Sequence, residues 1–149
     1  MQQSILEQLD RFTRRVCQTG NVWILHDGND CATTIAHDFE DDYGDSPELL
    51  CFWSSEDAAR ARAEDEWENY SPTPIPIGNF IEKWCTRMAD DGVIAGIDLD
   101  ENMNGPEREP LQLLLDIITE LKRTNKNVTL VKFKNITEIV EYVKRALDL

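Results

Sequence analysis

Two short apolar segments that contain tryptophan constrain this chain more than any other feature, residues 22–25 and residues 49–53. Short apolar runs bounded by polar residues predict buried strands. The second run continues into two serines that can cap a helix, and Glu56 and Asp57 follow where a helix dipole favours acidic side chains. A strand that passes directly into a helix predicts a compact domain in which helices pack against a sheet.

The spacing of apolar and turn-forming residues predicts the other elements. Helices are expected over residues 4–20, 54–67, 78–90, 110–121 and 137–147, and strands over residues 21–27, 31–36, 49–53, 93–99 and 128–133. The first two strands flank an Asp-Gly-Asn-Asp turn, which predicts a hairpin. Residues 71–76 hold three prolines and can form only an edge strand or an extended connector. The sequence therefore predicts an α+β fold with one mixed or mainly antiparallel sheet.

The helix that begins at Pro110 is apolar over much more than one stripe. Its apolar side chains are Leu111, Leu113, Leu114, Leu115, Ile117, Ile118 and Leu121. A helix of this kind must be buried. We therefore expect residues 110–149 to form a helix-strand-helix extension that packs on residues 1–109, with residues 128–133 as a further strand of the sheet. Residues 1–149 would then make a single domain.

Apolar runs and cysteines indicate the general class of protein. No apolar run approaches the roughly 20 residues that a membrane-spanning helix needs, and the N-terminus lacks the basic and apolar regions of a secretory signal. The four cysteines, Cys17, Cys31, Cys51 and Cys85, form no Cys-x-x-Cys pair, so we interpret them as reduced and mostly buried. These features predict a cytoplasmic protein.

The acidic side chains are concentrated in one part of the chain. The formal net charge is -14, and residues 37–68 carry twelve acidic and two basic side chains. A field of this sign repels nucleic acid and anionic membranes, and it attracts basic proteins. The alternative is that the acidity only keeps the protein in solution.

We expect a partner-binding surface within this acidic part. Trp67 and Tyr70 lie among acidic residues, and an accessible aromatic side chain in a charged patch is typical of protein interfaces. Trp67 could instead close one end of the hydrophobic core. The candidate partner-binding residues are Asp41, Asp42, Asp45, Glu64, Asp65, Glu66, Trp67, Glu68 and Tyr70.

The sequence contains none of the standard catalytic motifs, such as Gly-x-Ser-x-Gly, Gly-x-Gly-x-x-Gly or His-Glu-x-x-His. Residues 100–105 match the first half of a calcium loop, but Leu111 stands where the bidentate glutamate should be, which favours a simple turn. His26 and His37 do not have the spacing of zinc ligands. We therefore predict that the protein is not an enzyme, with no catalytic residue, no metal ligand and no cofactor.

Four motifs occur in an order that resembles one bacterial family. They are Val-Trp-Ile-Leu at residues 22–25, Phe-Trp-Ser-Ser-Glu-Asp-Ala-Ala at residues 52–59, an Ile-Pro-Ile segment followed by Phe, Ile and Trp within residues 75–84, and Asp-Gly-Val-Ile-Ala-Gly-Ile at residues 91–97. Over roughly residues 4–109 the chain is similar to the DUF2750 family, a domain of unknown function. The resemblance implies a small bacterial cytoplasmic domain, and it supplies no activity, cofactor or site residue.

The preferred hypothesis is a protein-binding module, in its specific form an immunity or antitoxin-type partner that covers a basic protein. It follows from the acidic residues 37–68 together with the missing catalytic motifs. A competing hypothesis is a small-molecule-binding or enzymatic domain with a pocket between sheet and helices, near Trp23, Trp53 and Trp84. Self-association of the basic C-terminal segment with the acidic face is a third reading, so the oligomeric state is left open.

Truncation after Glu109 should leave an insoluble or molten protein. Burying each large aliphatic side chain contributes about 1.5–3 kcal/mol, so losing this helix removes as much as the whole stability of a typical domain. A thermal melt of residues 1–109 beside the full chain measures this. A cooperative melt close to that of the full chain would show that residues 110–149 are only an appendage.

Overall fold

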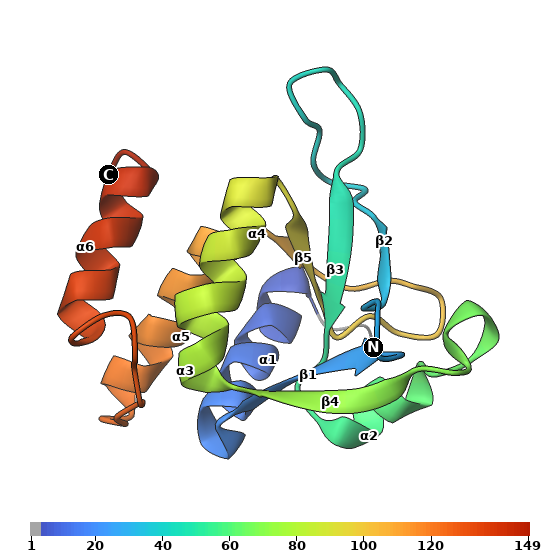
Figure 1. The fold of residues 1–149 in the computed structure, drawn as a ribbon, viewed down its shortest axis with the longest axis horizontal. Coiled ribbons are helices and arrows are strands. Elements are labelled where there is room, and N and C mark those ends of the chain that lie inside the picture. The colour runs from blue at the N-terminus through green and yellow to red at the C-terminus, as the bar shows by residue number, and fades with distance from the viewer. Residues whose placement is uncertain (1–3) are drawn as a thin grey trace.

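The computed structural model describes residues 4–149 and shows an α+β fold, which confirms the predicted fold class (Figure 1). The helices are α1 (Ile5–Thr19), α2 (Glu56–Ala61), the short 3-10 helix η1 (Asp65–Trp67), α3 (Ile77–Asn79), the π-helical η2 (Phe80–Trp84), α4 (Cys85–Asp91), α5 (Pro110–Arg123) and α6 (Ile136–Ala146). The strands are β1 (Asn21–His26), β2 (Thr33–Ile35), β3 (Glu48–Phe52), β4 (Ser71–Pro76), β5 (Ile94–Ile97) and β6 (Glu107–Arg108). Among the described residues, no helix is long and apolar enough to cross a membrane.

The strands form two sheets. The four-stranded sheet has the order β2-β3-β5-β6, with β3 parallel to β5 and the other pairs antiparallel, and β1 pairs with β4 in a second, antiparallel sheet. Trp23 and Trp53 join the sheets by exchanging two backbone hydrogen bonds of 2.9 and 2.8 Å. The two tryptophan segments that the sequence singles out therefore meet at the junction of the sheets.

The prediction that residues 21–27 and 31–36 pair as the two strands of a hairpin is wrong. The turn itself forms, because the carboxylate of Asp27 accepts the amide N–H groups of Asn29 and Asp30 at 2.9 and 2.7 Å. Beyond one bridge between His26 and Cys31, however, β2 leaves β1 and pairs with β3. The full length of β1 is instead occupied by β4, a partner more distant in the sequence.

The proline-rich β4 is an edge strand, one of the two alternatives for residues 71–76. Its prolines alternate with Ser71, Thr73 and Ile75 along the register with β1. Alternate residues of a strand point their N–H groups to opposite edges, so the prolines leave one edge without donors. This sheet therefore ends at two strands.

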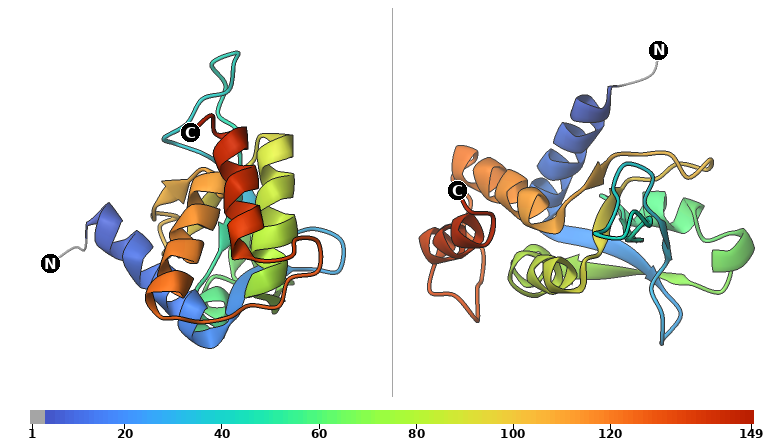
Figure 2. Two further views of the ribbon diagram at one scale, coloured as in Figure 1. Left: turned by 90° about the vertical axis from the view of Figure 1, so that its left-hand side faces the viewer. Right: turned by 90° about the horizontal axis from the view of Figure 1, so that it is seen from above.

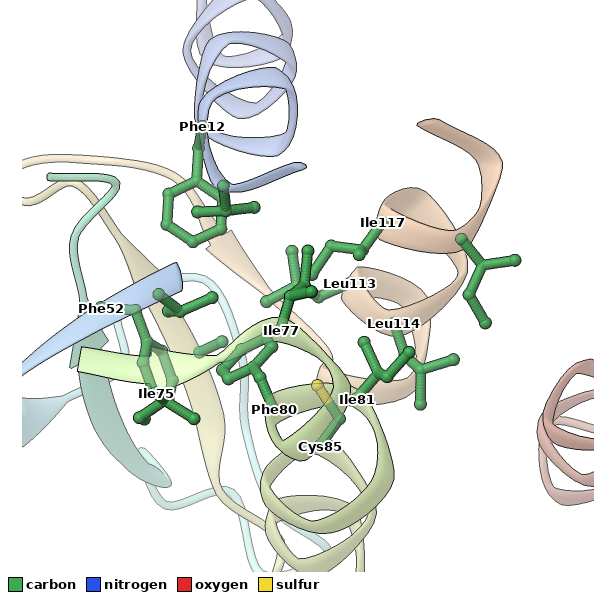
Figure 3. Packing of buried hydrophobic residues seen from close by; sticks show 14 of the residues in the cluster. Phe12, Phe52, Ile75, Ile77, Phe80, Ile81, Cys85, Leu113, Leu114 and Ile117 are labelled. Carbon is green, nitrogen blue, oxygen red and sulfur yellow. The ribbon is translucent and has the colours of Figure 1, made fainter. Parts of the chain in front are cut away.

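The apolar helix α5 packs into the main core, as predicted. Leu113, Leu114 and Ile117 are fully buried, and they share one hydrophobic cluster with Phe12 of α1 and Phe80 of η2 (Figure 3). The same cluster reaches as far as α6. Of the four cysteines, the three at positions 17, 51 and 85 are also buried, and all four are free thiols.

The prediction that residues 128–133 join the sheet is wrong. The backbone N–H groups of the last three of these residues are bound by Glu82, which is only 2% exposed and lies in the π-helical turn. Its carboxylate accepts the N–H groups of Val131 at 2.5 Å and Phe133 at 3.1 Å, and also that of Lys132. Because these N–H groups already donate to Glu82, they are not free to pair with a neighbouring strand.

Gly78 allows this segment to lie directly against the helix. A Cβ atom on Gly78 would lie 2.1 Å from the carbonyl oxygen of Thr129, which is closer than real contacts permit. Figure 2 shows the chain passing the helix on its way from α5 into α6. Gly78 and Glu82, one helical turn apart, thus dock the C-terminal segment onto the rest of the protein.

Replacing Glu82→Gln should lower the free energy of unfolding by about 2 kcal/mol, because the amide offers one acceptor where the carboxylate offers two and turns its own N–H groups toward the backbone donors of residues 131–133. Urea denaturation measures the change. Glu141→Gln, an exposed glutamate on α6, is the matched control and should stay within about 0.5 kcal/mol of the wild type. Equal stability of the two variants would contradict the docking role of Glu82.

Candidate protein-interaction surface

The structure places the predicted partner-binding residues in three separate regions. The first region, with Asp41, Asp42 and Asp45, is the loop between β2 and β3, which projects from the body of the molecule (Figure 1). The second region is formed by Glu64, Asp65, Glu66 and Trp67, which line a small cavity with Asp100, Glu101 and Met103, and Glu68 follows them in the chain. The third contains Tyr70, beside the turn after β1. The nine residues therefore do not form one continuous site.

Trp67 is buried, so the prediction of an exposed aromatic at this position is wrong. It is only 6% exposed and packs edge-on against Trp53, with ring centroids 6.2 Å apart. The reason is that α2 ends at Ala61 rather than near residue 67, and the chain reverses through Asp65, whose φ is 54°. Trp67 therefore closes one end of the core, which was the alternative reading.

The tryptophans proposed as pocket walls are packing residues. Trp53 is fully buried and donates its indole N–H to the carbonyl oxygen of Leu99 at 3.1 Å, and Trp84 packs edge-on against Phe52. A cavity of about 280 Å³ does lie among the helices, but residues such as Met88, Val93 and Leu111 line it. The competing small-molecule hypothesis thus loses Trp53 and Trp84 as its binding groups.

The base of the projecting loop is held by Glu107 of β6. Its carboxylate accepts the backbone N–H groups of His37 and Asp38, each at 2.9 Å. The N–H group of Ala36 donates to the carbonyl oxygen of Pro47 at 2.9 Å and closes the loop from the other side. Charge-assisted hydrogen bonds of this kind are strong, so the loop leaves the sheet in a fixed direction.

The tip of the loop is organised around Asp41. Its Oδ1 atom accepts the N–H groups of Tyr43 at 2.8 Å and Asp45 at 2.9 Å, and its own N–H donates to the carbonyl oxygen of Asp45. Gly44 takes the positive φ of 81° that the turn requires. Asp41 therefore shapes the turn, whereas Asp42 and Asp45 face solvent.

Tyr43 stands at this tip with 90% of its surface exposed, and the exposed residues Asp42 and Asp45 flank it in the chain. Tyrosine is enriched among the residues that dominate binding energies at interfaces. An aromatic ring surrounded by acids and presented on an ordered loop is suited to contact a basic protein surface. Three acids of this loop are among the predicted partner-binding residues, whereas Tyr43 is not, although it belongs to the same acidic run.

Other polar groups serve the fold. Asp98 accepts the N–H and hydroxyl groups of Ser54 at 2.8 and 2.9 Å, and burial raises the pKa of its carboxyl group. Asp100 accepts the N–H groups of Asn102 and Asn104, which makes residues 100–104 a turn, as expected. Within the described part of the chain, no cluster of three or more histidine, cysteine or acidic side chains is placed to hold a metal ion.

Removing the clamp should loosen the loop without unfolding the protein. In Glu107→Gln, we expect hydrogen exchange at the amides of His37 and Asp38 to accelerate at least about tenfold, because a charged acceptor is replaced by a weaker one. NMR-detected exchange on the full chain measures this. Glu109→Gln, an exposed glutamate two residues further on, is the control, and equal exchange in both variants would show that Glu107 does not hold the loop.

Comparison with known proteins identifies one family. No curated protein and no solved structure matches this chain. The model of one family, described as a protein of unknown function (DUF2750), matches residues 9–117. The match ends within α5, beyond the limit at residue 109 set by the sequence motifs, and it leaves α6 and the docked segment before it outside. Because the matched region is well over half of the chain, the protein belongs to the DUF2750 family.

Proposed function

We propose that this protein is a non-catalytic module that binds a basic protein, and that the projecting loop of residues 38–45 is its main contact. The observation that carries the proposal is Tyr43, which is 90% exposed at the tip of the loop and is flanked in the chain by the exposed residues Asp42 and Asp45. Ordering the loop before binding reduces the conformational entropy that is lost on association. The clamp of Glu107 and the turn of Asp41 supply that order.

The charge of the whole chain supports this proposal. The net charge is -14, with twelve acids in residues 37–68, so a basic partner would be attracted from a distance and oriented toward the loop. Complementary charge mainly raises the association rate and the specificity. We propose that the protein acts in the cytoplasm, and the free thiols at all four cysteines support this proposal because they fit a reducing compartment.

The specific form of the proposal is an immunity or antitoxin-type role. A nuclease toxin is basic where it holds its anionic substrate, and an acidic protein can cover the same surface. An aromatic ring at the end of an acidic loop suits insertion into a cleft that normally holds nucleic acid. This step is an analogy between classes of protein and rests on chemistry alone.

Affinity capture from the native host tests the proposal. The wild-type full chain should retain a protein with a basic isoelectric point, and Tyr43→Ala should lower the affinity of that protein, once purified, at least about tenfold. Mass spectrometry identifies the partner, and calorimetry measures the affinity. Binding should weaken steeply as salt increases.

Two double variants, one in the loop and a matched control outside it, each remove two negative charges. Asp42→Asn with Asp45→Asn should weaken binding, whereas Glu141→Gln with Asp148→Asn, both exposed at the C-terminal end, should leave it within about threefold of the wild type. Asp41 and Glu107 are left unchanged because they hold the loop. Capture of neutral or acidic proteins only, or equal binding by both double variants, would refute the proposal.

A further inference from the structure

A second feature lies at the stem of the hairpin that carries the projecting loop. It is a cavity of about 530 Å³, open to solvent. Its lining comes from four segments, namely the turn after β1, strands β2 and β3, and the residue before β4. The residues that matter for its chemistry are Asp30, Cys31, Thr33, Glu48, Leu50 and Tyr70.

The strand register places polar and apolar groups on one face of this hairpin. Thr33 lies opposite Leu50, and Ile35 lies opposite Glu48. Residues two apart along a strand share a face, so all four side chains point to the side of the cavity. Ile35 is 57% exposed, which leaves an apolar contact directly beside the carboxylate of Glu48.

The electrostatic environment of the cavity disfavours negative charge. Partial burial and the nearby carboxylates of Asp27 and Asp30 raise the pKa of the Tyr70 phenol. Burial and the same two carboxylates raise the pKa of the Cys31 thiol. Both groups therefore stay neutral, and a cation that enters the cavity meets only carboxylates and neutral groups.

We propose that this cavity receives the guanidinium group of an arginine side chain from a protein partner. Arginine fits better than lysine because its planar group can pair with a carboxylate through two hydrogen bonds and can also stack on an aromatic ring. Here the carboxylate would be that of Glu48 or Asp30, and the ring would be that of Tyr70. Its aliphatic stem would lie against Leu50 and Ile35. The inference rests on the proposed function, since the same hairpin carries the loop, and it adds the chemistry that the partner must present.

The test is an NMR titration of the full chain with a capped Gly-Arg-Gly peptide. We expect saturable shifts at the amides of Cys31, Thr33 and Glu48. A peptide with citrulline, which has the same shape without the charge, should bind at least about tenfold more weakly, and a lysine peptide should also bind more weakly. Shifts that do not saturate, that spread over the acidic surface, or that are equal for citrulline would overturn the inference.

Cys31 provides an independent readout on the wild-type protein. It is the half-exposed thiol among four cysteines, the other three being buried, so it should be the first to react with an alkylating reagent. The arginine peptide should slow this alkylation with the same concentration dependence as the NMR shifts. An unchanged alkylation rate at saturating peptide would contradict binding in the cavity.

Variants separate this inference from the proposed function. Glu48→Gln with Asp30→Asn should weaken binding of the arginine peptide at least about tenfold, whereas Asp42→Asn with Asp45→Asn should leave it within about threefold. If the peptide fails to bind while partner capture still depends on Tyr43, only the cavity inference is lost. If the peptide binds as expected but capture ignores Tyr43, the loop proposal is lost and the cavity stands.

Discussion

The pair of backbone hydrogen bonds between Trp23 and Trp53 joins the two sheets, and the position of the candidate surface depends on it. Strand β3 ends at this bridge, with β2 on one side and β5 on the other. Just beyond it, Asp98 caps Ser54, and the indole N–H of Trp53 donates to Leu99. Because β2, β5 and the bridge to Trp23 all bind β3 or its end, the hairpin that β3 forms with β2 has a fixed orientation on the rest of the protein.

The local signals in the sequence predict most helices well. Helix α1 begins where Ser4 accepts the N–H of Glu7 and ends at Gly20, whose φ is 81°, and both signals can be read from a few neighbouring residues. The strands are harder to predict because their partners are distant. Residues 128–133 have the composition of a strand, but Glu82, far away in the chain, accepts the N–H groups of Val131, Lys132 and Phe133.

The candidate surface, like the strands, depends on contacts between residues that are distant in the sequence. Its acidic composition is visible in the sequence and predicts Asp41, Asp42 and Asp45 as partner-binding residues. What each acid does is not visible, because Asp41 forms a turn and Glu107 reaches the loop from another strand. The cavity at the hairpin stem was missed for the same reason, since Asp30, Glu48 and Tyr70 come together only through strand pairing.

We propose that the β2–β3 hairpin contacts the partner, and that the sheets, α5 and the docked C-terminal segment support it. Photo-crosslinking in the native host tests this claim most directly. A photoreactive phenylalanine analogue replaces Tyr43 in one version of the full chain and the partly exposed Tyr142 of α6 in another. We expect a covalent adduct with a basic protein from position 43 and none from position 142, whereas adducts from position 142 alone, or from neither, would contradict a binding role of the hairpin.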